Sequence, residues 1–206
     1  MLVLNLLSAG GRAREQMPLF PLATVLYPGM LLPLRIFEPR YMDMAKACLK
    51  HEQAFGVCLI REGTETGAPA VPEAVGCLAR IIDWDMAQLG ILKVRCEGLE
   101  RFRLVDSKPT ANGLLIGDIE RVKTEESFDV PELDECTAFL RKVMEGIGPR
   151  RFREPFRFED ASWVGFRLCE ILPLKNPVKQ KLLELTDAGA RLEVLHRFLK
   201  QQKLID

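Results

Sequence analysis

Short apolar runs separated by prolines, glycines and polar turns fill about the first 123 residues of the chain. Proline fixes φ and lacks an amide donor, which restricts it to strand starts, strand edges and turns. The pattern near the N-terminus predicts strands over residues 19–20, 24–26 and 31–37, with a turn at Pro28-Gly29. Apolar residues at helical spacing then predict a helix that begins near Pro39.

Further strand-like segments follow at near-regular intervals. They cover residues 55–61, 75–84, 89–96, 99–105 and 114–122. Residues 62–72 are rich in turn formers and predict an exposed loop, and Gly98 is expected to break the chain between two strands. In residues 91–96, leucine, valine and cysteine alternate with charged residues, which is the period-two pattern of a half-buried strand. So many short strands predict a small closed or sandwiched antiparallel sheet.

The apolar spacing changes to a helical period after Lys123. One helix is expected to begin near residues 129–131, and others over 161–172, over 176–185 and after Asp187. Their inward residues are expected to include Leu133, Cys136, Leu140, Val143, Leu192, Leu195 and Leu199. The fold class predicted is therefore α+β, with a β-rich part over residues 17–123 and an α-helical part over residues 124–206.

Residues 1–16 form a predicted extension with leucines at positions 2, 4, 6 and 7. No charged residue precedes this apolar run, and the run is too short to cross a bilayer, so neither a secretory signal nor a membrane contact is expected. Exposed leucines cost about 25 cal/mol per Å² of apolar area. We therefore expect the extension to dock as an extra strand or plug, either on its own β-rich part or on a second copy, which would form a homodimer.

Composition narrows the classes of function. Hydrophobic residues make up 48% of the chain, which is enough for a folded core, and the 29 basic residues equal the 29 acidic residues. A nucleic-acid-binding protein usually has a basic excess. The six cysteines form no CxxC pair and only two histidines accompany them, so neither a metal nor another cofactor is expected. We interpret the cysteines as buried thiols of a protein in the reducing cytoplasm.

Several separated motifs resemble a known family. They are Met17-Pro-Leu-Phe-Pro-Leu22, Ile36-Phe-Glu-Pro-Arg-Tyr41, Gly-Cys-Leu-Ala-Arg-Ile-Ile at 76–82, Gly-Leu-Glu-Arg-Phe-Arg-Leu at 98–104, Trp163 and Leu172-Pro-Leu174. In this order they closely resemble the N-terminal, substrate-binding domain of Lon ATP-dependent proteases, over about residues 17–199. The resemblance implies a PUA-like β-barrel or pseudo-barrel followed by an α-helical bundle. The loop at residues 87–90 departs from the polar Asp-Gly-type turn expected there.

No catalytic motif accompanies this resemblance. A full Lon protease also carries ATPase and peptidase domains, but this chain has neither a GxxxxGK[ST] phosphate loop nor a GxSxG elbow. His51-Glu52 lacks the second histidine of HExxH, and Ser107 and Lys108 would point to opposite faces of a strand. The sequence therefore predicts a stand-alone member of the family that is not an enzyme.

The resemblance implies recognition of polypeptide. The expected partners are unfolded or damaged chains, with a protease or chaperone as a further candidate partner, in an adaptor or regulator role in protein quality control. Tyr27 and Met30 in the first turn, and Met86 near the predicted loop, are candidate contacts for apolar segments. An open sheet edge is a further candidate, because it can accept an added strand.

An arginine- and phenylalanine-rich segment supports an alternative hypothesis. Its candidate contacts to nucleic acid or to a partner are Arg150, Arg151, Phe152, Arg153 and Arg157. Arginine can hold phosphates and exposed rings can stack on bases, and PUA-like folds elsewhere bind RNA, which is an analogy only. The balanced charge favours a different interpretation, a connector whose phenylalanines anchor in the core while its arginines stay in water. A protein-docking surface is the third interpretation.

Overall fold

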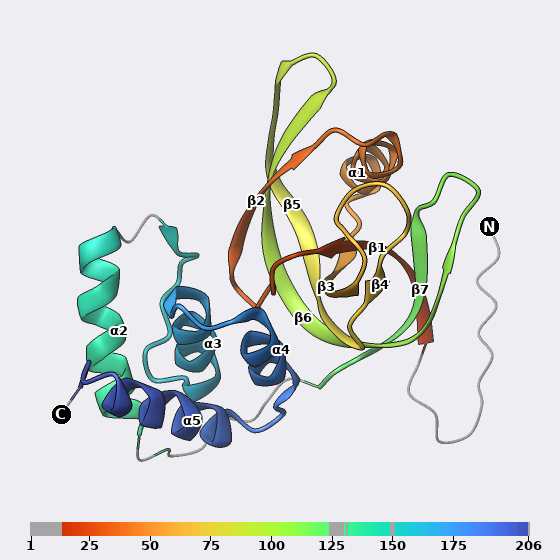
Figure 1. Cartoon of the computed structure of the whole chain (residues 1–206). Helices are drawn as coiled ribbons and strands as arrows, with labels where there is room; N and C mark the ends of the chain where they lie inside the picture. Colours follow the sequence, from red (N-terminus) through yellow and green to blue (C-terminus); the bar gives the residue numbers. More distant parts are fainter. Residues whose placement is uncertain (1–13, 124–129, 131, 149–150, 206) are drawn as a thin grey trace.

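The computed structural model of the chain describes residues 14–123, 130, 132–148 and 151–205. Strands fill the first part of the chain and most of the helices the second (Figure 1). The strands are β1 (Arg14–Leu22), β2 (Leu31–Ile36), β3 (Phe55–Glu62), β4 (Val71–Pro72), β5 (Val75–Gln88), β6 (Ile91–Pro109) and β7 (Leu115–Arg121). The helices are α1 (Pro39–His51), α2 (Leu133–Ile147), α3 (Ala161–Ile171), α4 (Asn176–Glu184) and α5 (Ala188–Gln201).

A ring of strands closes in the order β1, β7, β6, β5 and β3. β1 completes this barrel, because it pairs antiparallel with β7 and parallel with β3. β2 pairs with the first half of β6, and β4 extends the sheet beside β3. α1 contributes Tyr41, Met44 and Cys48 to a core cluster that includes Phe55 and Val57 of β3. The α+β class and the PUA-like barrel followed by helices are confirmed.

β1 is longer than the strand expected at residues 19–20, although it contains two prolines. Each proline lies where β1 has a partner on one side only: Pro18 pairs with β7, whereas Pro21 pairs with β3. Proline is tolerated at such edge-like positions because its missing amide faces no partner. Residues 14–16 thus begin β1 and do not belong to an extension. The docking of the preceding residues stays a prediction, because residues 1–13 lie outside the described residues.

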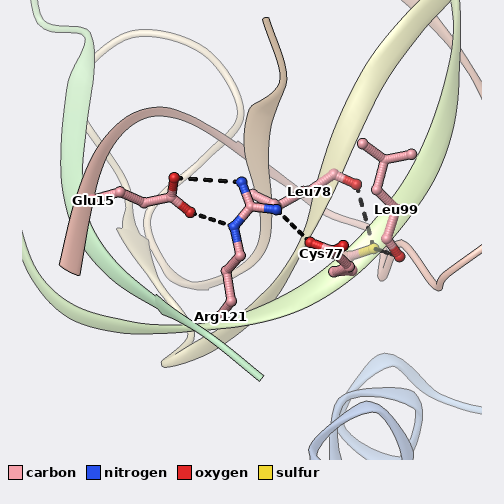
Figure 2. Close-up of polar contacts among 6 residues, drawn as sticks. Glu15, Cys77, Leu78, Leu99 and Arg121 are labelled. Carbon is pink, nitrogen blue, oxygen red and sulfur yellow. Dashed lines mark hydrogen bonds and ion pairs between the residues drawn. The ribbon is translucent and has the colours of Figure 1, made fainter. Parts of the chain in front are cut away.

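The seam between β1 and β7 carries a cluster of ion pairs (Figure 2). Arg121 of β7 donates from Nε to Glu15 Oε1 over 2.7 Å and from Nη1 to Glu100 Oε2 over 2.5 Å. These bonds, above all the bond to Glu15, raise the pKa of Arg121. Exposed pairs of this kind contribute only about 0.2–1 kcal/mol each. The backbone ladder and the core therefore hold the seam, and the ion pairs help to fix its register.

β6 passes through Gly98 without the break that this glycine predicted. The glycine is required by a close approach, because a Cβ at residue 98 would lie 2.1 Å from the carbonyl oxygen of Tyr27. There the Gly29 amide donates to the Gly98 carbonyl over 2.7 Å, and the Gly98 amide donates to the Met30 carbonyl over 2.9 Å. The strand expected at residues 24–26 is wrong, since these residues are irregular and lead into the turn that docks on β6.

The helices follow the predicted pattern closely. Asp160 caps α3 by accepting from the amides of Ser162 and Trp163, and Asp187 caps α5 by accepting from the amide of Ala190. The inward residues of α5 are fully buried, as predicted. α2 begins at Leu133; its buried face is formed by Cys136, Leu140 and Met144, and Val143 is only half-buried.

Buried cations join the barrel to the helices. Arg167 of α3 is fully buried and donates from Nη1 to the Gly29 carbonyl over 2.6 Å and from Nη2 to the Pro28 carbonyl over 2.7 Å. Its Nε lies 3.3 Å from Oε2 of Glu170. Burial lowers the pKa of Arg167 and raises the pKa of Glu170, because both charges have lost most of their water. The turn before β2 is thereby tied to α3.

Other buried polar groups strengthen this junction. Arg101 of β6 donates from Nη1 to the carbonyls of Leu183 and Leu185, over 2.7 and 2.5 Å. Gln180 of α4 donates to the Val75 carbonyl of β5 over 2.9 Å. In these contacts side-chain donors satisfy carbonyls of the buried junction, and the Leu185 carbonyl also accepts from Nη2 of Arg191 over 2.6 Å. The barrel and the helices are therefore joined by directed hydrogen bonds as well as by apolar packing.

All six cysteines are buried free thiols, in agreement with the expectation from their apolar neighbours. Burial raises the pKa of Cys58, Cys96, Cys136 and Cys169 to about 12. Cys77 lies inside the barrel beside the carbonyls of Leu78 and Leu99 (Figure 2). Because the thiolate is the reactive form, we expect no rapid reaction with a colorimetric thiol reagent at pH 8 and reaction of all six thiols in denaturant. Rapid labelling of one thiol in the native protein would contradict this expectation.

Candidate functional site

The hairpin of β5 and β6 projects beyond the barrel and ends in a free tip (Figure 1). We call residues 82–93 of this hairpin the arm. Its large apolar side chains are unusually exposed: Ile82 by 36%, Trp84 by 56%, Met86 by 40% and Leu89 by 96%. Exposed apolar side chains that gather on one projecting element are typical of an interaction site.

The geometry of the hairpin explains why these side chains lie where they do. Trp84 lies opposite Val94 and Asp85 lies opposite Lys93. Because side chains alternate between the faces of a strand, the indole shares a face with the buried Val94, and the charged pair lies on the other face. Gly90 has φ of +81° in the turn between Gln88 and Ile91, a conformation that suits glycine.

A groove of about 500 Å³ lies at the base of the arm, beside the end of α1. It is lined by Cys48, Leu49, Glu52, Gln53, Arg80, Ile81, Ile82 and Trp84. Trp84 and Ile82 belong to both the groove and the arm, so an apolar side chain in the groove would contact the same indole. The arm offers apolar side chains and the groove adds the polar side chains of Glu52, Gln53 and Arg80, so together they form one candidate surface for apolar segments with polar neighbours.

Two of the three contacts predicted for a polypeptide keep some exposure, and one does not. Met86 lies on the arm, and Met30 is half-buried between two core clusters. Tyr27 is fully buried, and its hydroxyl donates to the Lys179 carbonyl over 2.9 Å. Burial also raises its pKa strongly. The prediction of Tyr27 as a surface contact is wrong, because its ring packs near Phe166 of α3 and has no surface left for a partner.

The arginine- and phenylalanine-rich segment uses its rings inside the molecule. Phe152 is buried, and Phe156 and Phe158 pack against Trp163 with ring centroids 6.1 and 5.2 Å away. Arg153 pairs with Glu97 at 3.2 Å and Arg157 with Asp160 at 3.5 Å, whereas Arg151 is exposed. Arg150 lies outside the described residues. The phenylalanines of this segment therefore do not offer the open stacking platform that single-stranded RNA requires.

Neither a metal site nor a membrane-spanning helix is found among the described residues. Among them, no group of three or more histidine, cysteine, aspartate or glutamate side chains is arranged to hold a metal ion. No helix in this described part of the chain is both long and apolar enough to span a membrane. The chemistry that the arm and groove offer is apolar contact supplemented by hydrogen bonds.

A closed barrel joined to helices, with an apolar arm, has the features of a binding domain. The chain belongs to the family described as the ATP-dependent protease La (LON) substrate-binding domain, which matches residues 16–201. Lon protease 1 of Hydrogenovibrio crunogenus is 28% identical over 185 residues, covering 82% of this chain and 22% of that protein. Lon protease of Escherichia coli K12 is 25% identical over 199 residues, covering 92% of this chain and 25% of that protein. The chain spans about a quarter of the length of these relatives.

One solved structure supports the same family, and a second shows the same fold. A Lon N-terminal domain protein from Xanthomonas campestris superposes with a TM-score of 0.74 at 35% identity, over 88% of this chain and 96% of that chain. The N-terminal domain of a Mycobacterium avium complex Lon protease has a TM-score of 0.66 at 19% identity, over the same shares, and shows the fold alone. The resemblance seen in the sequence is confirmed.

Sequence reasoning identified Met86 but missed its neighbours. Trp84, Ile82 and Leu89 are exposed with it. The signal was present, because Ile-Asp-Trp-Asp-Met alternates apolar and acidic residues, and Leu89 stands where a polar turn residue was expected. The sequence predicts residues 75–84 only as a strand, whereas in the structure β5 continues to Gln88 and the apolar side chains near its end lie past the core.

Proposed function

We propose that this domain recognises exposed apolar segments of non-native polypeptide without hydrolysing them. The family supports this proposal, because its description names substrate binding. The observation that carries the proposal is the arm, which presents Trp84, Met86 and Leu89 to solvent on one projecting hairpin. Aromatic and methionine side chains are enriched at interfaces and adapt to varied partners.

The energetics favour weak and reversible binding. Burial of one large apolar side chain contributes about 1.5–3 kcal/mol, so three of them contribute about 4.5–9 kcal/mol in total. Lost translational and rotational freedom offsets about 4 kcal/mol or more of this gain. A domain that passes its clients to another protein benefits from such easy release.

The proposed role is that of a cytoplasmic adaptor or regulator in protein quality control. A protease or chaperone partner would supply the ATP-driven and hydrolytic steps, and the client would be an unfolded or damaged chain. The Lon proteases among the relatives support this role, because they contain a region similar to this chain within a longer protein.

The test replaces the exposed apolar side chains of the arm. A combined Trp84→Ser, Met86→Ser and Leu89→Ser variant is expected to bind fluorescent, reduced and carboxymethylated α-lactalbumin at least about tenfold more weakly, because it loses the apolar burial. Fluorescence anisotropy at physiological salt measures the affinity. The matched control replaces comparably exposed residues outside the arm, as Val178→Ser, Val194→Ser and Leu204→Ser.

Equal weakening of both variants, or no weakening of the arm variant, would contradict the role of the arm. The wild-type chain should also be titrated with a fluorescent single-stranded RNA. Tight RNA binding that falls steeply with salt would favour the nucleic-acid hypothesis over the polypeptide hypothesis.

A further inference from the structure

One edge of β2 has no strand beside it in the described part of the chain. β2 pairs with β6 along Leu31 to Ile36, and no other described strand pairs with it. An unpaired edge carries a row of backbone donors and acceptors and can accept another extended chain. This edge differs from the arm, because it offers backbone groups in addition to apolar side chains.

The register shows which groups point outward. The Gly98 amide donates to the Met30 carbonyl over 2.9 Å, so this carbonyl faces β6. Antiparallel residues alternate between facing the partner and facing away, which turns the backbone groups of Leu31, Pro33 and Arg35 outward. Pro33 has no amide to leave unpaired, as expected for an edge position. Among the described residues, the outward groups of Pro33 and Arg35 have no hydrogen-bond partner.

An apolar groove of about 370 Å³ runs beside this edge. Phe20, Leu22 and Tyr41 form buried parts of its wall, and Glu65 and Thr66 line it from the loop after β3. Phe37 follows β2 along the same groove and is 58% exposed. A chain added to β2 would place every second side chain against the groove, because side chains alternate along a strand.

The outer face of β2 carries an unbalanced charge. Arg35 lies directly opposite Lys93 of β6, and both side chains are exposed. Lys93 has Asp85 of β5 opposite it on its other side, whereas Arg35 lies at the edge and has no described strand beyond it. Within the described residues Arg35 forms no ion pair. An acidic side chain on the other side of β2 would give Arg35 the opposite charge that Asp85 gives Lys93.

We propose that the free edge of β2 binds an extended segment of client polypeptide as an added strand, with apolar side chains at alternate positions facing the groove and an acidic side chain beside Arg35. This inference rests on the proposed function and adds to it a binding mode and a sequence preference. The added strand donates to the Pro33 carbonyl and exchanges hydrogen bonds with both backbone groups of Arg35.

A second copy that pairs through β2 about a two-fold axis at Pro33 fits the edge less well than a client does. If two β2 strands paired about a two-fold axis at Pro33, the two prolines would face each other at the centre. Neither proline can donate, so both central hydrogen bonds would be missing. A client with an ordinary residue at that position supplies the amide that the Pro33 carbonyl needs.

Two fluorescein-labelled decapeptides test the proposal, one alternating valine with serine and the other alternating valine with glutamate. We expect wild-type protein to bind the glutamate peptide about two- to fivefold more tightly, the range for an exposed ion pair. Arg35→Ala should remove this preference. Arg35→Pro should in addition lower the affinity for the serine peptide by roughly tenfold, because it removes the outward amide and leaves the hydrogen bonds between β2 and β6 in place. A thermal melt checks that both variants remain folded.

Amide hydrogen exchange gives an independent result on unmodified protein. Binding of the glutamate peptide should slow exchange at the Arg35 amide, which points outward, and a peptide N-methylated at alternate residues should not. Suppose that α-lactalbumin and the peptides bind, but that Arg35→Pro and Arg35→Ala bind the serine peptide with equal affinity and the Arg35 amide exchanges as fast as in the free protein. The added-strand proposal is then wrong, and the proposed function stands. If wild-type protein binds neither α-lactalbumin nor the peptides, the proposed function fails first. If the wild-type protein forms a dimer and Arg35→Pro dissociates it, the edge binds a second copy and not a client.

Discussion

Replacement of Arg167 by methionine is expected to lower the free energy of unfolding by about 3–5 kcal/mol, the usual range when one partner of a buried ion pair is removed. Arg167 is fully buried and holds the carbonyls of Pro28 and Gly29 as well as the carboxylate of Glu170. Methionine fills much of the same space but leaves all three acceptors without this donor. The buried Glu170 then bears most of the cost, since its pKa is already raised by burial.

Urea unfolding followed by circular dichroism measures the change. A double variant, Arg167→Met with Glu170→Gln, should recover part of the loss because it removes the unpaired charge. Arg197→Met is the matched control, because Arg197 pairs with Glu193 on the exposed side of α5 and should change stability by about 0.5 kcal/mol or less. A loss of less than about 1 kcal/mol in Arg167→Met would show that the junction does not depend on this cation.

Substitution of Gly98 by alanine is expected to lower the free energy of unfolding by about 3 kcal/mol, at the upper end for overpacking. The added Cβ would lie 2.1 Å from the Tyr27 carbonyl oxygen, which is backbone and cannot rotate away. The turn would have to move off β6, and the hydrogen bonds of Gly98 with Gly29 and Met30 would lengthen or break. Because the turn also carries the acceptors of Arg167, the damage would spread to the junction.

Gly146→Ala is expected to change the free energy of unfolding in the opposite direction. Gly146 lies in α2, and nothing lies within 4 Å of a Cβ built there. Alanine should therefore stabilise the helix by up to about 1 kcal/mol. Urea unfolding of both variants compares them directly, and a Gly98→Ala protein as stable as wild type would mean that β6 and the turn can separate at little cost.

The order of elements followed from local patterns in the sequence. The caps at Asp160 and Asp187 and the inward leucines of α5 depend on spacings of a few residues, and the structure agrees with them. The same holds for the turn at Pro28-Gly29 and for the buried cysteines. Such features depend on the residue itself and its nearest neighbours, and for this reason they could be predicted.

Features set by distant contacts could not be predicted in this way. Gly98 looked like a strand break because its close neighbour, Tyr27, is 71 positions earlier in the chain. Tyr27 resembled a surface aromatic because its partner carbonyl belongs to Lys179. Arg167 carries no local sign of burial, since arginine is mostly exposed in proteins. For the candidate site, the sequence identified Met86 correctly as exposed, but the projection of the arm depends on the strand pairings of the whole barrel.

The closure of the barrel has a consequence for how the protein is made. Arg14 in the first strand bonds Glu120 in the last, 106 positions later, so the ring cannot close until both ends exist. At about 5–20 residues per second, a ribosome needs roughly 5–20 s to synthesise that interval. Such long-range strand pairing is slow to form even in a complete chain. The apolar strands of the nascent barrel are therefore exposed for seconds, and during that time the chain itself is the kind of polypeptide that the finished domain is proposed to bind.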